Sequence, residues 1–426
     1  MRVVVLASLV VLLGARSVAA HEGRFPEAQQ LLFEGDALVG VATTVGLMVP
    51  SDEGWRWTCR SGIGLRDQED PIWARADGRF VVASFDGIVL GDPCAFDYVP
   101  ALRRQVVLDV HRAANGRFFA VTSNGSGPNA LWTSEDGEAW IAGANLPLPA
   151  LFERVRTAPS NPDVVYLSGF EPPEEFGGVR DALIWASTDG GATFEERRLT
   201  LLPGEVTLFL LEVDATNPSR LFARTLRDLA ARSIFERVLQ SDDGGATWTT
   251  RFEVPLFGAF ARRGTTTYVG GRDPGEPPPV PGSPPRELGL WRAEDGADFE
   301  HVFTGGQVKC LNVRDDGLFA CLGGASPFVV GRSNDDGAGF TSLLAWSEVT
   351  GPVECGVDAP TPTRCVPEED GHNREHFGLL DAGVDGGTSG GGGGCSTSSR
   401  PEGRAWLLLG LVGFRRPRRS RSKNAA

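Results

Sequence analysis

The sequence predicts an all-β protein. Its 426 residues include 55 glycines, 29 prolines and 10 tryptophans, and almost no long stretch has the 3.6-residue apolar spacing of a helix, so short strands joined by turns are expected. An acidic turn that ends in an aromatic residue recurs along the chain, and these aromatic residues lie 39 to 54 positions apart. That interval is the length of a four-stranded blade, and seven copies predict a seven-bladed β-propeller of four-stranded blades.

Two copies of the turn are clearest, S-T-D-G-G-A-T-F at residues 187–194 and S-D-D-G-G-A-T-W at residues 241–248. The pattern S-x-D-x-G-x-T-[WF] resembles the Asp-box, or BNR repeat, of sialidases, sortilin and many bacterial propellers. The aspartate accepts hydrogen bonds from the turn backbone, glycine permits a left-handed conformation, and the aromatic ring is buried between blades. The resemblance implies a structural turn between the third and fourth strands, carried by Ser187, Asp189, Gly191, Thr193, Phe194, Ser241, Asp243, Gly245, Thr247 and Trp248.

Five weaker copies complete the series. Three keep the aspartate and the aromatic ring, and the two nearest the N-terminus are degenerate and end at Trp57 and Phe96. Because short degenerate motifs also arise by chance, six or eight blades are the alternatives to seven, within a propeller over residues 25–346. In the third blade, strands are expected at 106–110, 117–122, 130–134 and 139–142. The three better copies contribute Asp136, Trp140, Asp295, Phe299, Ser333, Asp335, Gly337 and Phe340.

The N-terminus has the three parts of a secretory signal peptide in order. Arg2 is followed by an apolar run from Val3 to Leu13 and by small residues up to Ala20. We therefore expect a signal peptide over residues 1–20 with cleavage after Ala20. The alternative, a membrane anchor, is disfavoured because the run is short for a span and Arg16 interrupts it.

The C-terminal region predicts a linker and a sorting signal. Residues 347–394 are acidic, rich in glycine and proline and poor in aromatic residues, which predicts a disordered stalk. Residues 395–426 contain Cys395, an apolar stretch and a basic end, an order that resembles the myxobacterial C-terminal sorting signal (MYXO-CTERM). The resemblance implies processing at Cys395 and membrane association through this segment only, although its apolar part is about half the roughly 20 residues of a membrane span. A disordered basic tail is the alternative.

Charge restricts the class of partner. The formal net charge is −14; residues 396–426 carry eight basic residues and one acidic residue, so their removal gives −21, and loss of Arg2 and Arg16 gives −23. An acidic mature protein argues against nucleic acid as a partner, because phosphate binding relies on clustered Lys and Arg. We expect an exported monomer at the outer cell surface, or secreted after C-terminal processing, without a cofactor.

Seven cysteines in an exported chain predict disulfides with one thiol left over. Cys310 and Cys321 flank the turn Arg314–Gly317 symmetrically, so a two-residue hairpin would place them opposite each other, and a one-residue bulge would undo this register. Cys355 and Cys365 can close a small loop in the predicted linker. Cys59 and Cys94 then pair by elimination.

No catalytic constellation emerges. His372-Asn373-Arg374-Glu375-His376 fits the H-x-x-E-H pattern of some zinc proteases, which requires a helix, but its surroundings predict a solvated linker and no metal site. A sialidase-like glycosidase would need an arginine cluster, a tyrosine nucleophile and an acidic proton donor. Only Tyr98, Tyr166 and Tyr268 are available as nucleophiles, and no catalytic residue can be assigned.

The first functional hypothesis is therefore a non-catalytic surface module that binds a protein, peptide or glycan. Insertions between the second and third strands of blades lie on the face opposite to the acidic turns, where propellers build sites. Two such insertions, 171–181 and 272–287, supply the binding candidates. A sialidase-like glycoside hydrolase and a structural surface protein without a specific ligand are the alternatives. The candidates are Glu171, Glu174, Glu175, Phe176, Arg180 and Arg272.

Overall fold

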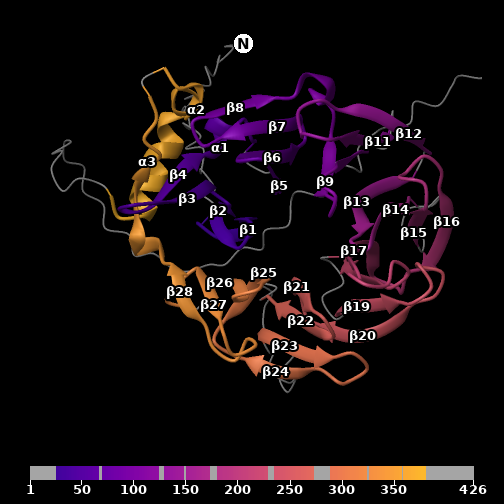
Figure 1. Cartoon of the computed structure of the whole chain (residues 1–426). Helices are drawn as coiled ribbons and strands as arrows, with labels where there is room; N and C mark the ends of the chain where they lie inside the picture. The colour runs from indigo at the N-terminus through magenta and orange to yellow at the C-terminus, as the bar shows by residue number, and fades with distance from the viewer. Residues whose placement is uncertain are drawn as a thin grey trace, which may run out of the picture.

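The computed structural model describes residues 25–66, 70–123, 129–147, 150–172, 180–228, 235–272, 288–323, 326–356 and 358–379. Seven sheets stand in a ring, and the chain passes through them in order (Figure 1). The predicted seven-bladed β-propeller of four-stranded blades is confirmed. The predicted signal peptide with Ala20, the sorting signal with Cys395 and the linker beyond residue 379 lie outside the described residues.

Each blade is a meander of four consecutive strands. The first strand of each blade lies nearest the axis of the ring, and these seven are called the inner strands (Figure 1). Blades 1 to 3 comprise β1 (Ala28–Glu34), β2 (Ala37–Thr43), β3 (Gly46–Ser51) and β4 (Gly54–Cys59); β5 (Ile72–Ala76), β6 (Arg79–Ser84), β7 (Gly87–Asp92) and β8 (Ala95–Tyr98); and β9 (Val107–Arg112), β10 (Phe118–Thr122), β11 (Asn129–Ser134) and β12 (Ile141–Leu146). The strands expected for the third blade lie within a few residues of these bounds.

The remaining blades continue the same order. They comprise β13 (Leu151–Ala158), β14 (Asn161–Glu171), β15 (Asp181–Ser187) and β16 (Glu195–Thr200); β17 (Glu205–Val213), β18 (Leu221–Arg227), β19 (Glu236–Ser241) and β20 (Thr249–Val254); β21 (Phe257–Arg263), β22 (Thr266–Gly271), β23 (Gly289–Glu294) and β24 (Glu300–Phe303); and β25 (Gln307–Arg314), β26 (Gly317–Gly323), β27 (Val330–Ser333) and β28 (Thr341–Leu344). Two 3₁₀ turns, η1 (Pro100–Leu102) and η2 (Trp346–Glu348), lie after blades 2 and 7.

The apolar core is divided among the spaces between neighbouring blades. Seven clusters of buried side chains each join two adjacent blades, and the aromatic residue that closes an acidic turn either belongs to the cluster or, half-buried, packs against it. Burying these rings is favourable by about 25 cal/mol for each Å² of apolar surface removed from water, so they hold adjacent sheets together. In ring order from the space between blades 7 and 1, the rings are Trp57, Phe96, Trp140, Phe194, Trp248, Phe299 and Phe340.

The acidic turns are held by their own side chains. In blade 5, the Asp243 carboxylate accepts hydrogen bonds from the Thr247 amide (2.9 Å), the Thr247 hydroxyl (2.6 Å) and the Ser241 hydroxyl (2.8 Å). Gly245 has φ +96°, and a Cβ there would lie 3.0 Å from Ile184 of the neighbouring blade. Glycine thus serves both the left-handed turn and the close approach of blades 4 and 5.

The chain beyond blade 7 folds back onto blades 1 and 2, which corrects the predicted start of the linker at residue 347. β29 (Val349–Pro352) adds to β4 as a fifth, parallel strand of blade 1, and helices α2 (Pro360–Arg364) and α3 (Pro367–His376) follow. Residues 349–379 are called the clasp. The clasp is poor in apolar residues, but Phe377 packs on Trp57 with ring centroids 5.3 Å apart. Two disulfides also fix the clasp to the first two blades.

The described part of the chain has three disulfides, and two of the pairings differ from those expected. Cys310 and Cys321 pair across the β25–β26 hairpin as predicted. The pairings Cys355–Cys365 and Cys59–Cys94 are wrong: Cys59 bonds Cys365, and Cys94 bonds Cys355. Spacing along the chain favoured short loops, whereas the return of the clasp brings its two cysteines to the fourth strands of blades 1 and 2.

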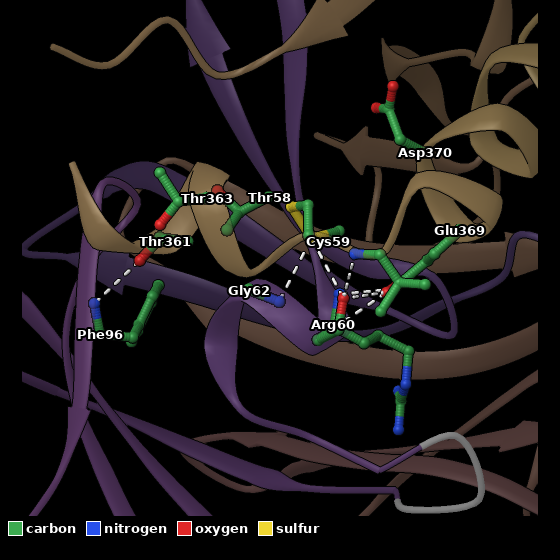
Figure 2. Close-up of a disulfide and its surroundings, with 12 residues drawn as sticks. Thr58, Cys59, Arg60, Gly62, Phe96, Thr361, Thr363, Glu369 and Asp370 are labelled. Atoms are coloured by element: carbon green, nitrogen blue, oxygen red, sulfur yellow. Dashed lines mark hydrogen bonds between the residues drawn. A yellow bond between two sulfur atoms is a disulfide. The ribbon is translucent and has the colours of Figure 1, made fainter. Parts of the chain in front are cut away.

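Polar contacts reinforce these disulfides (Figure 2). The Glu369 carboxylate of α3 accepts hydrogen bonds from the amides of Arg60 (2.7 Å) and Ser61 (3.1 Å), at the start of the short helix α1 (Arg60–Ile63). Thr361 of α2 accepts one from the Phe96 amide at 3.0 Å. These contacts, together with the disulfides, fix the clasp to the first two blades.

Candidate functional site

Four arginines gather on blades 4 to 6 near the inner strands, and they are called the arginine cluster: Arg154, Arg180, Arg224 and Arg272. Arg154 lies on β13 and Arg224 on β18. Arg180 precedes β15 and Arg272 follows β22, so both stand at the end of the ring where second and third strands are connected, opposite to the acidic turns. All four side chains keep partial contact with solvent.

Aromatic rings position three of these guanidinium groups. The Phe209 ring lies between two of them, with its centroid 4.7 Å from the Cζ atom of Arg154 and 5.0 Å from that of Arg224. Arg224 also lies 4.8 Å from the Phe257 ring, and Arg180 lies 5.3 Å from the Phe170 ring. Stacking on a ring face is worth about 0.5–2 kcal/mol for each contact, and it leaves guanidinium N–H groups free to donate.

Three arginines of the cluster donate to main-chain carbonyl groups. Arg154 donates to Leu108 (3.3 Å) and Glu153 (2.8 Å), Arg180 to Val206 (3.5 Å), and Arg272 to Phe257 (3.1 Å). Within the described ranges, none of these three forms an ion pair with a carboxylate. In this part of the chain, their charge therefore has no direct carboxylate partner.

Two buried carboxyl groups of the described residues, Glu153 and Glu236, lie beside the cluster. Glu236 forms an ion pair with Arg224 (3.1 Å) and accepts a hydrogen bond from the Phe257 amide (2.8 Å). Glu153 accepts one from the Thr207 hydroxyl (2.6 Å), and burial raises its pKa above the ordinary range despite Thr207 and the arginines. Burial also lowers the pKa of Arg154 and of Arg224. Among the described residues, four arginines thus lie beside two carboxyl groups, and burial raises the pKa of one of these, Glu153, so this balance of charge favours an anion.

The structure brings together two of the binding candidates that were predicted from the sequence. Arg180 and Arg272 belong to the cluster, whereas Glu171 lies on β14 and pairs with Arg198 of the outer strand β16 at 2.5 Å. Glu174, Glu175 and Phe176 lie outside the described residues. Arg154 and Arg224 were missed, because an arginine within a strand gives no sign of which neighbouring blade it faces.

The three tyrosines considered as nucleophiles have structural partners. None lies on an inner strand: Tyr98 donates to the Gly64 carbonyl, Tyr166 to the Pro218 carbonyl (2.9 Å), and Tyr268 to Asp336 (3.2 Å). Burial raises the pKa of Tyr166, and burial together with Asp336 raises that of Tyr268 to about 12. A raised pKa opposes formation of the phenolate that a nucleophile requires.

A second set of charges joins inner strands closer to the acidic turns. The Asp109 carboxylate of β9 is fully buried and pairs with Arg156 of β13 at 2.7 Å, and Arg262 of β21 pairs with Asp214, just past β17. Burial raises the pKa of Glu212 to about 7. Burial also opposes ionisation of Asp214, but hydrogen bonds from Thr216 and Arg262 outweigh it and keep that pKa low.

No cluster of three or more histidine, cysteine, aspartate or glutamate side chains suited to a metal ion occurs among the described residues. In the same part of the chain, no helix has the length and apolar character to cross a membrane. Three disulfides are typical of proteins that fold in an oxidising, extracytoplasmic compartment.

Comparison with solved structures identifies propellers. An ancestral GH74 enzyme superposes with a TM-score of 0.51 at 12% identity, covering 74% of this chain and 46% of the enzyme. A puromycin-hydrolyzing peptidase from Mycobacterium tuberculosis gives 0.49 at 13% identity, covering 74% of this chain and 53% of the peptidase. The chain thus spans about half the length of these proteins. At 12% identity the likeness to the GH74 enzyme shows the fold alone. No family model matches the sequence, and no curated protein matches it.

Proposed function

We propose that this protein is an exported, non-catalytic propeller that binds an anionic group of a glycan or peptide at the arginine cluster. The observation that carries the proposal is the set of three arginines, Arg154, Arg180 and Arg272, which have no carboxylate partner among the residues that the structure describes. Arginine forks bind carboxylate and sulfate groups through paired hydrogen bonds, and partial burial strengthens those bonds.

Export and surface display belong to the same proposal. The N-terminal pattern up to Ala20 supports a signal peptide, and Cys395 with the basic tail supports a sorting signal of the MYXO-CTERM kind. The hydrogen bonds of Asp189 and Asp243 support membership of the acidic turns in the Asp-box, or BNR, class. The disulfides are consistent with this location.

Binding is favoured over sialidase-like hydrolysis because the tyrosine hydroxyls donate hydrogen bonds to other groups, away from the arginine cluster. A tyrosine nucleophile needs a lowered pKa and a place beside the arginines, and the pKa values of Tyr166 and Tyr268 are raised. Neither lies on an inner strand. The cluster therefore provides the recognition part of such a site without its nucleophile.

A glycoside hydrolase of another kind is the second candidate. Glu212 and Asp214 lie two residues apart at the end of β17, and their pKa values are shifted in opposite directions, as in an acid and base pair. The fold shared with an ancestral GH74 enzyme supports the same possibility. Against it, Asp214 already holds Arg262, Thr216 and Asn217.

Calorimetric titration with matched probes tests the proposal. Sialyllactose, a galacturonic acid oligomer and an acidic peptide are compared with lactose, a neutral galactose oligomer and the amidated peptide. Only anionic probes should bind. Arg180→Gln and Arg272→Gln should each weaken binding by about tenfold, the value of one charge-assisted hydrogen bond. Neither change leaves a buried carboxylate without its ion-pair partner.

Arg198→Gln is the matched control, because it removes the same charge from an outer strand. It should leave binding unchanged. Equal loss in this control, or no binding by any anionic probe at millimolar concentration, would reject the cluster as a site and favour a structural protein without a ligand. Turnover of chromogenic glycosides that is lost in Glu212→Gln would instead support the hydrolase.

A further inference from the structure

We propose that His372 and His376 on helix α3 form a binding site for a divalent transition-metal ion of the Cu²⁺ or Ni²⁺ type. The two residues begin and end the H-x-x-E-H stretch that the sequence placed in a solvated linker. The structure corrects that expectation, since this stretch is helical within Pro367–His376. A spacing of four places both imidazoles on one side of the helix.

The two rings face each other through their Nε2 atoms. These atoms are 2.7 Å apart, with ring centroids at 4.1 Å and ring planes at 81°. Without an ion, such an approach requires one Nε2 to donate a proton to the other. A shared cation instead uses both lone pairs, while each Nδ1 keeps its proton.

The distance between the nitrogen atoms favours one coordination geometry. With metal–nitrogen bonds of about 2.0 Å, two ligands at 90° are separated by about 2.8 Å, and two tetrahedral ligands by about 3.3 Å. The observed 2.7 Å is close to the first value. Square-planar or tetragonal sites with nitrogen ligands suit Cu²⁺ and Ni²⁺, whereas zinc prefers the tetrahedral arrangement.

The surroundings of α3 hold this pair in place. Cys365, two residues before the helix, is bonded to Cys59; Glu369 is anchored to α1; and Phe377, directly after the helix, packs on Trp57 and Trp346. Arg374 and Asp370 form an ion pair along the helix at 2.8 Å. A ligand pair on a fixed helix loses little conformational freedom when it binds an ion.

The site has two protein ligands among the residues described. No third histidine, cysteine or carboxylate joins them there, so the remaining positions of the ion are open to water or to an added ligand. The exposed Glu375 and the missing third ligand distinguish the pair from a zinc protease centre, which holds its metal with three protein ligands. The pair therefore binds metal without the hydrolytic assembly.

Titration of the oxidised full chain, without an affinity tag, tests the site with CuSO₄, NiCl₂ and ZnCl₂. One Cu²⁺ should bind at this helix, and its paramagnetic resonance spectrum should show coupling to two imidazole nitrogens. His372→Ala and His376→Ala should each weaken this binding at least about tenfold, because the second ligand acts at a high effective concentration. Glu375→Gln, an exposed change on the same helix, is the control.

Folding is checked separately by circular dichroism and thermal melting in the presence of EDTA, where all variants should match the parent. Cu²⁺ affinity and nitrogen coupling that survive in the double variant His372→Ala/His376→Ala would overturn the proposal. So would tighter binding of Zn²⁺ than of Cu²⁺. Loss of anion binding in the arginine variants has no effect on this test, so the two proposals fail independently.

Discussion

Cys59 and Cys365 are 306 positions apart in the chain, yet their α carbons lie 5.9 Å apart and a disulfide joins them. Ten residues earlier in the clasp, Cys355 bonds Cys94 of the next blade. Each bond closes a loop of chain that contains most of the propeller. Either one alone keeps the clasp beside blades 1 and 2, so their contributions to stability depend on each other.

Removal of both clasp disulfides should cost more than the sum of the single removals. Each cross-link lowers the entropy of the unfolded chain according to the loop that it closes, and it typically stabilises the fold by about 2–4 kcal/mol. While either bond remains, it still closes a loop between residues at least 261 positions apart, so most of the loop-closure entropy is regained only when both are gone. Cys59→Ser/Cys365→Ser, Cys94→Ser/Cys355→Ser and the fourfold variant are compared by urea unfolding. Strictly additive losses would contradict this coupling.

Trp140→Ala should lower the free energy of unfolding by about 3–5 kcal/mol, because it empties the space between blades 2 and 3. Trp140 is 7% exposed, and its ring nitrogen donates to the Gly137 carbonyl at 2.8 Å. The neighbouring Ile141 is 72% exposed, so Ile141→Ala should change stability by less than about 0.5 kcal/mol. Similar losses in both variants would contradict the role of the ring in joining blades.

His111 should make the fold sensitive to acid. Burial, together with the charge of Arg156, lowers its pKa from 6.5 to about 3 in the folded state. Between these two pH values, His111 is protonated in the unfolded chain but not in the folded one. The free energy of unfolding therefore falls as the pH falls below 6.5, by roughly 1.4 kcal/mol per pH unit. In urea unfolding from pH 4 to 7.5, His111→Gln should flatten this slope. An unchanged slope would show that His111 is protonated in the fold.

Glu212 should act in the opposite direction. Burial raises its pKa from 4.5 to about 7, so from pH 4.5 to 7 the folded state holds a proton that the unfolded state has lost. The contribution of Glu212 to the free energy of unfolding is complete below pH 4.5. It decreases as the pH rises from 4.5 to 7, again by roughly 1.4 kcal/mol per pH unit. Glu212→Gln should therefore steepen the gain in stability between pH 5 and 7. A gentler gain in this variant would contradict the raised pKa.

Binding by the arginine cluster should weaken as salt rises, because Arg154, Arg180 and Arg272 keep partial contact with solvent. Titrations of an anionic probe at about 50 and 500 mM NaCl measure this change. The Arg272→Gln variant should show a smaller dependence on salt than the parent. Binding that is indifferent to salt would point to apolar contacts.

The propeller was predictable because its signals are local. The turns ending at Phe194 and Trp248 carry their own hydrogen-bond partners, and their spacing sets the length of a blade. The hairpin disulfide Cys310–Cys321 followed from a symmetric turn for the same reason. The arginine cluster was only partly predictable, since Arg180 and Arg272 lie in recognisable insertions while Arg154 and Arg224 lie within strands.

The sequence by itself determined the repeated turns and the four-stranded meander, because each of these depends on residues a few positions apart. The number of turns predicted seven blades, with six or eight as alternatives. Only the tertiary structure decided how Cys59, Cys94, Cys355 and Cys365 pair, that residues 349–379 fold onto the ring, and that the helix of His372 and His376 is fixed to blade 1. Those outcomes depend on closing a ring, which brings the two ends of the propeller together and makes contacts between residues some three hundred positions apart.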